Sequence, residues 1–249
     1  MGYGLEGKLA VVTGGTGGIG SVVSRMLLEN GARVAVIGGR EDRLKKTEEE
    51  LSLYGEIKGF AINLSDPEQI PQGIEQIRSE MGEISCLVQA AGLMSGKPAL
   101  ELTVEDWDAV MNVNARGLFF VMKEVVKQSM QNGGGTIVNF SSMAGVRGMP
   151  KPMCAAHYSA SKGAVAAMTM QGAVEWADLG IRVNAVAPGG VRVGGMLEPP
   201  PQAVANVPLK KLSEPEDIGN VVLFLLSEQS AMITGQTMII DGGSHVVGC

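Results

Sequence analysis

The chain has 249 residues, of which 45% are hydrophobic, 18% charged and 4% aromatic. This apolar content supports a full hydrophobic core and excludes wholesale disorder, and the 35 glycines show no collagen-like period. A net charge of −6, with no block of lysines or arginines, argues against a nucleic-acid partner.

Cysteines and histidines are scarce, which narrows the chemistry further. The 3 cysteines form no C-x-x-C motif, as is usual in a reducing compartment, and 2 histidines cannot build a His-based metal cluster. The first residues lack the layout of a signal peptide, and the longest apolar run, residues 221–226, is too short to span a bilayer. We therefore expect a cytoplasmic protein with no metal, no membrane and no nucleic acid among its partners.

Short apolar runs alternate with longer amphipathic stretches along the chain. The apolar runs predict strands at residues 8–13, 33–37, 57–62, 85–90, 136–140, 181–187 and 236–240. Helices are expected at residues 18–30, 41–53, 65–81, 103–131, 157–179 and 213–226, three of them opened by capping residues from Ser65, Thr103 and Ser213. Strands that are apolar throughout and separated by helices predict an α/β fold, a doubly wound parallel sheet with helices on both faces in a single domain over residues 1–249.

Two stretches, residues 142–156 and 189–212, show neither the apolar runs expected of strands nor the amphipathic period expected of helices. Each follows the carboxyl end of a strand, where open α/β sheets bind ligands, and long loops in such places usually form lids or site walls. We expect residues 189–212 to be a substrate lid. Methionines at the expected ligand end could line an adaptable apolar pocket; they are Met94, Met143, Met149, Met153 and Met196.

Glycines dominate the first strand-to-helix turn, residues 13–20 (TGGTGGIG). They permit a tight turn and close approach of the backbone to a pyrophosphate, and the helix N-terminus adds free N–H groups and a positive dipole end. A P-loop is excluded because no Lys-Ser/Thr follows. An ordinary glycine-rich turn remains the alternative, but the place in the first strand–helix–strand unit favours dinucleotide binding. The candidate contacts are Gly14, Thr16, Gly18, Ile19 and Gly20.

Tyr158 and Lys162 are four residues apart, so one face of a helix carries both. A free phenol has a pKa of ~10, and a nearby ammonium lowers that pKa toward the working range of an acid/base catalyst. Ser142, at the end of a strand, could hydrogen-bond the same substrate oxygen. A surface Tyr/Lys pair and a turn serine are the plainer interpretations, but both groups adjoin the irregular loop 142–156.

Together these motifs resemble the short-chain dehydrogenase/reductase family over nearly the whole chain. Tyr158 and Lys162 match its catalytic pair, Ser142 its catalytic serine and Asn114 its tetrad asparagine; Pro188-Gly189 and residues 240–243 are also typical. The resemblance implies a Rossmann-like fold with Tyr158 as general acid/base. It further implies that Lys162 lowers the pKa of Tyr158 and holds the nicotinamide ribose, that Ser142 positions the carbonyl or hydroxyl, and that Asn114 anchors a proton-relay water.

The resemblance also implies a nicotinamide cofactor, NADP(H) or NAD(H). Its further contacts would be Asn63, Leu64, Gly92, Pro188, Gly189 and Val191. An NAD site places Asp or Glu at the end of the second strand, but Gly38 stands there, and Arg40 can contact a 2′-phosphate. We therefore favour NADP(H), although Gly17 replaces the Arg or Lys that NADP-preferring relatives often carry in the glycine turn.

Several positions depart from the family pattern. Gln89 replaces an asparagine, Asn63 an aspartate and Val193 a threonine, and the segment from Ser142 to Tyr158 is longer than usual. The four residues that match the family's catalytic tetrad, Asn114, Ser142, Tyr158 and Lys162, are all present. His157, beside Tyr158, has no G-x-S-x-G serine to serve and is interpreted as a site-wall residue.

The function we expect is interconversion of a secondary alcohol and a ketone by hydride transfer, on an apolar or cyclic small molecule, in a homotetramer. One alternative is reduction of a 3-oxoacyl thioester, which would favour a basic patch at the site mouth, whereas residues 189–207 offer only Arg192. Another is a cofactor-binding regulator without turnover, against which the complete tetrad argues.

Overall fold

A computed structural model of the chain describes residues 2–149, 154–194 and 201–247. Its centre is a seven-stranded sheet in the order β3-β2-β1-β4-β5-β6-β7, and every neighbouring pair is parallel. The strands are β1 (Leu9–Thr13), β2 (Arg33–Gly38), β3 (Ile57–Ala61), β4 (Ile84–Gln89), β5 (Gly135–Phe140), β6 (Ile181–Pro188) and β7 (Thr237–Ile240). The predicted doubly wound α/β architecture is confirmed.

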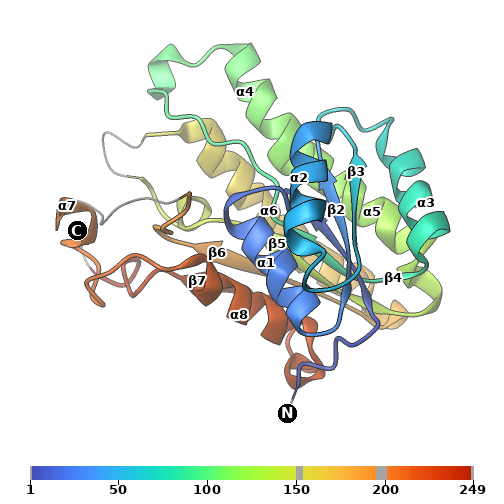
Figure 1. Ribbon diagram of the computed structural model, residues 1–249. Helices are drawn as coiled ribbons and strands as arrows, with labels where there is room; N and C mark the ends of the chain where they lie inside the picture. Colours follow the sequence, from blue (N-terminus) through green and yellow to red (C-terminus); the bar gives the residue numbers. More distant parts are fainter. Residues whose placement is uncertain (1, 150–153, 195–200, 248–249) are drawn as a thin grey trace.

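Helices cover both faces of the sheet (Figure 1). They are α1 (Gly18–Glu29), α2 (Glu41–Leu51), α3 (Ile70–Met81), α4 (Val104–Met111), α5 (Leu118–Gln128), α6 (Ala156–Glu175), α7 (Pro201–Val204) and α8 (Pro215–Leu226). One core packs α1, α2 and α8 against the sheet, and a second core packs α3, α5 and α6 against the opposite face. Two buried faces explain why central strands such as β1 are apolar at every residue.

The order of the strands creates a crevice beside β1. This strand pairs with β2 on one side and with β4 on the other. The chain therefore builds the sheet on one side of β1 as far as β3 and on the other side from β4 onward. Such a switch point, at the carboxyl ends of parallel strands, is where open α/β sheets bind ligands.

Helix starts test the capping predictions. At Thr103 the prediction is correct, because Thr103 Oγ1 accepts from Asp106 N at 3.2 Å and Asp106 Oδ2 accepts from Thr103 N at 3.0 Å. The helix expected from Ser65 begins only at Ile70, because Asp66 uses its carboxylate locally and accepts from Glu68 N at 3.1 Å. The last long helix likewise begins after Glu214 and not after Ser213.

The helix predicted over residues 103–131 is interrupted. Between α4 and α5 the chain forms a π-helical turn, Asn112–Gly117. The backbone of Leu64 lies against this turn so closely that a Cβ on Gly117 would be 2.2 Å from Leu64 O. π turns of this kind often carry functional residues, and this one contains Asn114.

The beginning of the expected lid is hydrogen-bonded to Ser213, the residue that directly follows the lid. Arg192 N donates to Ser213 O at 2.9 Å, and Ser213 N donates to Gly190 O at 3.0 Å. Within residues 189–212, residues 195–200 lie outside the described part of the chain, as do Met153 and Met196. In the part that is described, no helix is long and apolar enough to cross a membrane.

Candidate active site

The glycine turn after β1 is shaped by close backbone contacts. Gly14 has a φ of +69°, and a Cβ on it would lie 2.7 Å from Ala91 N. A Cβ on Gly20 would lie 2.3 Å from Gly14 O. Both positions therefore require glycine, as the dinucleotide turn predicts.

The start of α1 offers room and donors for an anion. Gly17 is the N-cap residue and has no side chain to accept from the first helical N–H groups. Nothing lies within 4 Å of a Cβ built on Gly17 or Gly18. Open space before unpaired N–H groups at the positive end of a helix fits a pyrophosphate.

At the end of β2, Gly38 lies against the glycine turn and Gly39 is next to open space. A Cβ on Gly38 would be 3.1 Å from Thr16 Cγ2, whereas a Cβ on Gly39 would meet nothing within 4 Å. The Arg40 side chain is 58% exposed, and its Nε lies 3.6 Å from Asp42 Oδ1. The cation proposed to contact a phosphate is therefore already beside a carboxylate.

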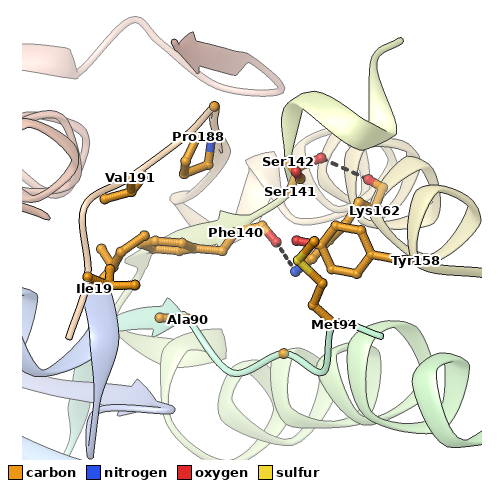
Figure 2. Close-up of a pocket in the computed structure, with 13 residues that line it drawn as sticks. Ile19, Ala90, Met94, Phe140, Ser141, Ser142, Tyr158, Lys162, Pro188 and Val191 are labelled. Carbon is orange, nitrogen blue, oxygen red and sulfur yellow. Dashed lines mark hydrogen bonds between the residues drawn. The ribbon is translucent and has the colours of Figure 1, made fainter. Parts of the chain in front are cut away.

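The four candidate catalytic residues come from three elements around the end of β5. Tyr158 and Lys162 lie on α6, with Lys162 Nζ 5.8 Å from the centroid of the Tyr158 ring. Lys162 Nζ donates to Phe140 O at 2.7 Å (Figure 2). Ser142, directly after β5, makes a hydrogen bond with the Tyr158 side chain. The spacing argument for Tyr158 and Lys162 is thus satisfied in three dimensions.

The direction of the Tyr158 pKa shift differs from the expectation. Burial raises the pKa of Tyr158, and the hydrogen bond with Ser142 only partly opposes this. Burial also lowers the pKa of Lys162 to about 8. The expected lowering of the Tyr158 pKa by Lys162 is therefore wrong for this structure, because desolvation dominates both groups.

Asn114 is fully buried in the π turn. Its Oδ1 accepts from Leu93 N at 2.7 Å, and its Nδ2 donates to Leu93 O at 2.9 Å and to Ser161 Oγ at 3.1 Å. The side chain thereby ties the segment after β4 to α6, close to Lys162. Its expected part in anchoring a water stays a prediction.

A cavity of ≈ 240 Å³ joins these parts (Figure 2). Among the predicted residues, it is lined by Ile19, Gly92, Ser142, Tyr158, Lys162, Pro188, Gly189 and Val191. Met94, one of the methionines expected to line a pocket, is also part of the wall, whereas Met143 and Met149 are not. Ala90, Phe140, Ser141 and Val193 complete the wall. Thr16, Arg40, Asn63, Leu64 and Asn114 lie outside this lining, as do Gly14, Gly18 and Gly20.

Some predicted contacts have other partners in this structure. Asn63 Oδ1 accepts from Ser65 N at 3.1 Å and from Ser65 Oγ at 2.8 Å, so this side chain is engaged in a local turn. By contrast, the two late motifs do meet, since Gly189 N donates to Ile240 O at 2.9 Å and a Cβ on Gly189 would be 2.6 Å from Asp241 Cβ.

Sequence reasoning missed Phe140 and Ser141. Phe140 acts through its backbone carbonyl, and Ser141 Oγ donates to Lys162 O at 2.8 Å. Every residue carries a backbone carbonyl, so the sequence could not indicate that the carbonyl of Phe140 accepts from Lys162. The signal available for Ser141 was its place beside Ser142 at the end of a strand.

A family model described as enoyl-(acyl carrier protein) reductase matches residues 14–245. The chain belongs to the short-chain dehydrogenase/reductase family. Among its curated relatives, a 3-oxoacyl-[acyl-carrier-protein] reductase of Thermotoga maritima is 37% identical, over 96% of this chain and 98% of the relative. A 3alpha-hydroxysteroid dehydrogenase of Mediterraneibacter gnavus is 36% identical, over 97% and 98% of the two chains. An NAD⁺-bound xylitol dehydrogenase matches in structure with a TM-score of 0.90 at 30% identity, over 96% of this chain and all of that one.

This short-chain dehydrogenase/reductase is therefore an oxidoreductase that interconverts CH–OH and C=O groups with a nicotinamide cofactor. The relatives share the reaction class and differ widely in substrate, so the family assignment alone leaves the substrate open.

Proposed function

We propose that the protein reduces apolar or cyclic ketones, and oxidises the corresponding secondary alcohols, at the cavity between Tyr158 and Val191. The observation that carries this is the chemical division of the cavity wall. Hydroxyls of Ser142 and Tyr158 lie at one part of it, while Met94, Phe140 and Val193 supply apolar surface. Sites of this composition orient a ligand with a few polar groups and bind it by apolar burial.

Proton transfer is assigned to Tyr158. In reduction, the substrate carbonyl oxygen would accept hydrogen bonds from Ser142 Oγ and Tyr158 Oη, and the Tyr158 proton would move to that oxygen as the alcohol forms. The raised pKa keeps the phenol protonated at neutral pH, which suits a general acid. In oxidation the same oxygen would return its proton to the phenolate. A bound nicotinamide supplies the hydride to the carbonyl carbon, or accepts it from the alcohol.

Cofactor binding is assigned to the glycine turn and its surroundings. Gly14, Gly18, Ile19 and Gly20 would receive the pyrophosphate at the start of α1, supported by the open space there. Lys162 would hold the ribose with its remaining N–H donors. Pro188, Gly189 and Val191 would face the nicotinamide, and Thr16, Asn63, Leu64 and Gly92 would contact the rest of the cofactor.

We further propose that the cofactor is NADP(H). Gly38 and Gly39 supply no carboxylate to repel a 2′-phosphate. Arg40 follows them directly in the chain and would pair with that phosphate. The ion pair of Arg40 with Asp42 weakens this preference, and the likeness to an NAD⁺-bound dehydrogenase keeps NAD(H) as the alternative.

A 3-oxoacyl thioester is the second candidate substrate, because a relative that is 37% identical is named for that reaction. A carrier protein with an acidic surface would need basic residues near the lid. Arg192, at the base of the lid, is paired with Glu214, with Nε 3.1 Å from Oε2. Lys210 and Lys211 in the same lid are exposed, so our preference for the free apolar ketone rests on the apolar cavity wall and not on the charge of the lid.

Assembly and location complete the proposal. A homotetramer is supported by exposed apolar side chains on α4, α5 and α6, and a cytoplasmic location by the reducing environment that free Cys86 and Cys154 suit. We also retain residues 189–212 as the proposed substrate lid of one domain.

A panel of substrates tests the function. Turnover is followed by nicotinamide absorbance with cyclic ketones, short keto acids and a 3-oxoacyl thioester, each with NADPH and with NADH. The proposal expects the highest kcat/KM on apolar cyclic ketones. Efficient turnover of small charged keto acids alone would refute it, and tight cofactor binding without any turnover would favour a regulatory protein.

A further inference from the structure

The segment that leaves β4, residues 92–97, is held at alternate positions by different elements; we call it the β4 loop. Leu93 is bonded through both its N–H and its carbonyl to the Asn114 side chain. Lys97 forms an ion pair with Asp106 on α4, and its backbone bridges to Ala155, directly before α6. Between these two anchors the loop runs past the catalytic cavity.

The middle anchor is His157. Its Nε2 lies 2.8 Å from Ser95 Oγ, and the ring is fully buried. Among the described residues, His157 Nδ1 has no hydrogen-bond partner, so the bond to Ser95 is the polar interaction that the ring makes there. Burying an imidazole that lacks one of its two hydrogen bonds costs more free energy than burying an apolar side chain. The hydrogen bond that the ring does make links α6 to the β4 loop.

The link has a direct geometric consequence for Met94. This residue lies between the anchored Leu93 and Ser95, lines the cavity, and extends toward Tyr158 in Figure 2. Met94 is 60% exposed, so an occupant of the cavity could cover its side chain. Because His157 immediately precedes Tyr158 on α6, one helix turn sets both the position of the acid/base group and the position of the loop.

We propose that His157 is a positioning residue for substrate selection. Through Ser95 it holds the β4 loop so that Met94 forms a wall against which an apolar substituent of the ketone packs, near Tyr158. The inference rests on the proposed function and adds to it the group that discriminates substrate size. Methionine suits such a wall, because its unbranched side chain adapts to apolar surfaces of different shape.

The test compares a small ketone, 2-butanone, with a bulky one, trans-1-decalone. Ser95→Ala and His157→Leu should each raise the KM for decalone by about tenfold, because each removes the one hydrogen bond that orders the loop at this point. The values of kcat and the KM for 2-butanone should stay nearly unchanged. His157→Gln, which keeps a donor and an acceptor, should restore the KM for decalone. The double variant Ser95→Ala/His157→Leu should be no worse than either single variant, because both remove the same link. Ser79→Ala, at an exposed serine on α3, is the matched control.

Equal rises in KM for both ketones, a general fall in kcat, or additive effects in the double variant would overturn the proposal and indicate a merely structural role. If His157→Leu does not fold, Ser95→Ala carries the same comparison. Amide hydrogen exchange of residues 92–97 separates this inference from the proposed function. If wild type turns over no ketone, the proposed function is refuted. Positioning of the loop by His157 is still supported if exchange is faster in Ser95→Ala and slow again in His157→Gln. Unchanged exchange would refute the positioning.

Discussion

Lys162 Nζ donates a hydrogen bond to Phe140 O at 2.7 Å, which fixes a buried ammonium at the carboxyl end of β5. The next residue, Ser141, donates from Oγ to Lys162 O at 2.8 Å, and the residue after it, Ser142, bonds to Tyr158. Three consecutive residues thus place three parts of the catalytic site. The end of β5 acts as the reference point from which α6 and its Tyr–Lys pair are positioned.

Burying Lys162 should make stability depend on pH in a specific direction. Below pH 8 the folded and unfolded states are both protonated at this lysine, and the folded state carries the cost of the buried charge. Its folded pKa is about 8 and its unfolded pKa 10.5, so the folded state binds fewer protons between these values and stability rises across that window. Relative to Lys162→Met, wild type should gain roughly 3 kcal/mol from pH 8 to pH 10.5.

Urea unfolding of both proteins at several pH values measures this difference, and other titrating groups cancel in the comparison. A difference that stays constant with pH would show that the lysine is not desolvated in the folded protein.

Replacing Tyr158 with phenylalanine should abolish turnover while leaving the cofactor affinity nearly unchanged. The ring still packs in its partly buried site and only the proton donor is removed, which typically costs ~10²–10⁴-fold in kcat. Cofactor titration by fluorescence and steady-state kinetics together check this. Activity at the wild-type level would exclude Tyr158 as the acid/base group.

Gly117→Ala should destabilise the fold and damage the site. The added Cβ would lie 2.2 Å from Leu64 O, so the π turn or the segment after β3 must shift, at a cost of about 1–3 kcal/mol. Because the same turn holds Asn114, kcat should fall as well. Gly133→Ala is the control, since nothing lies within 4 Å of its added Cβ. Equal thermal stability of the two variants would contradict the proposed contact.

The parts of this molecule that sequence predicted are those encoded locally. Gly20 is dictated by its contact with Gly14 O in the same turn, and the spacing of Tyr158 and Lys162 is a property of one helix. The parallel pairing of the strands also follows from local pattern, because buried strands that alternate with helices leave few other arrangements.

What sequence did not predict depends on distant neighbours. The π turn at Asn112–Gly117 packs against the backbone of Leu64, which is far away in the chain and leaves no room for a Cβ on Gly117. The raised pKa of Tyr158 comes from burial that only the assembled site creates. The bond between His157 and Ser95 likewise joins two segments that no local pattern connects.

Association into a homotetramer should depend on the outer faces of α4 and α6. Val104 is 70% exposed and Val174 77% exposed, and Trp107 and Met170 on the same helices are also exposed. Val174→Glu should therefore weaken association by placing a charge in an apolar contact. Light scattering at working concentration measures the mass of wild type and variant. Monomeric wild type would rule out the tetramer.

We predict that the cofactor preference depends on Arg40. Arg40→Ala should lower kcat/KM with NADPH by about tenfold and leave that with NADH unchanged, because a solvent-exposed charged contact contributes only modestly. Lys46→Ala removes a cation from the exposed side of the same helix and should change neither value. Asp42→Asn should act in the opposite direction and raise kcat/KM with NADPH, because it frees the guanidinium and removes a charge that repels the 2′-phosphate. Preference of wild type for NADH, together with no effect of Arg40→Ala, would assign the site to NAD(H).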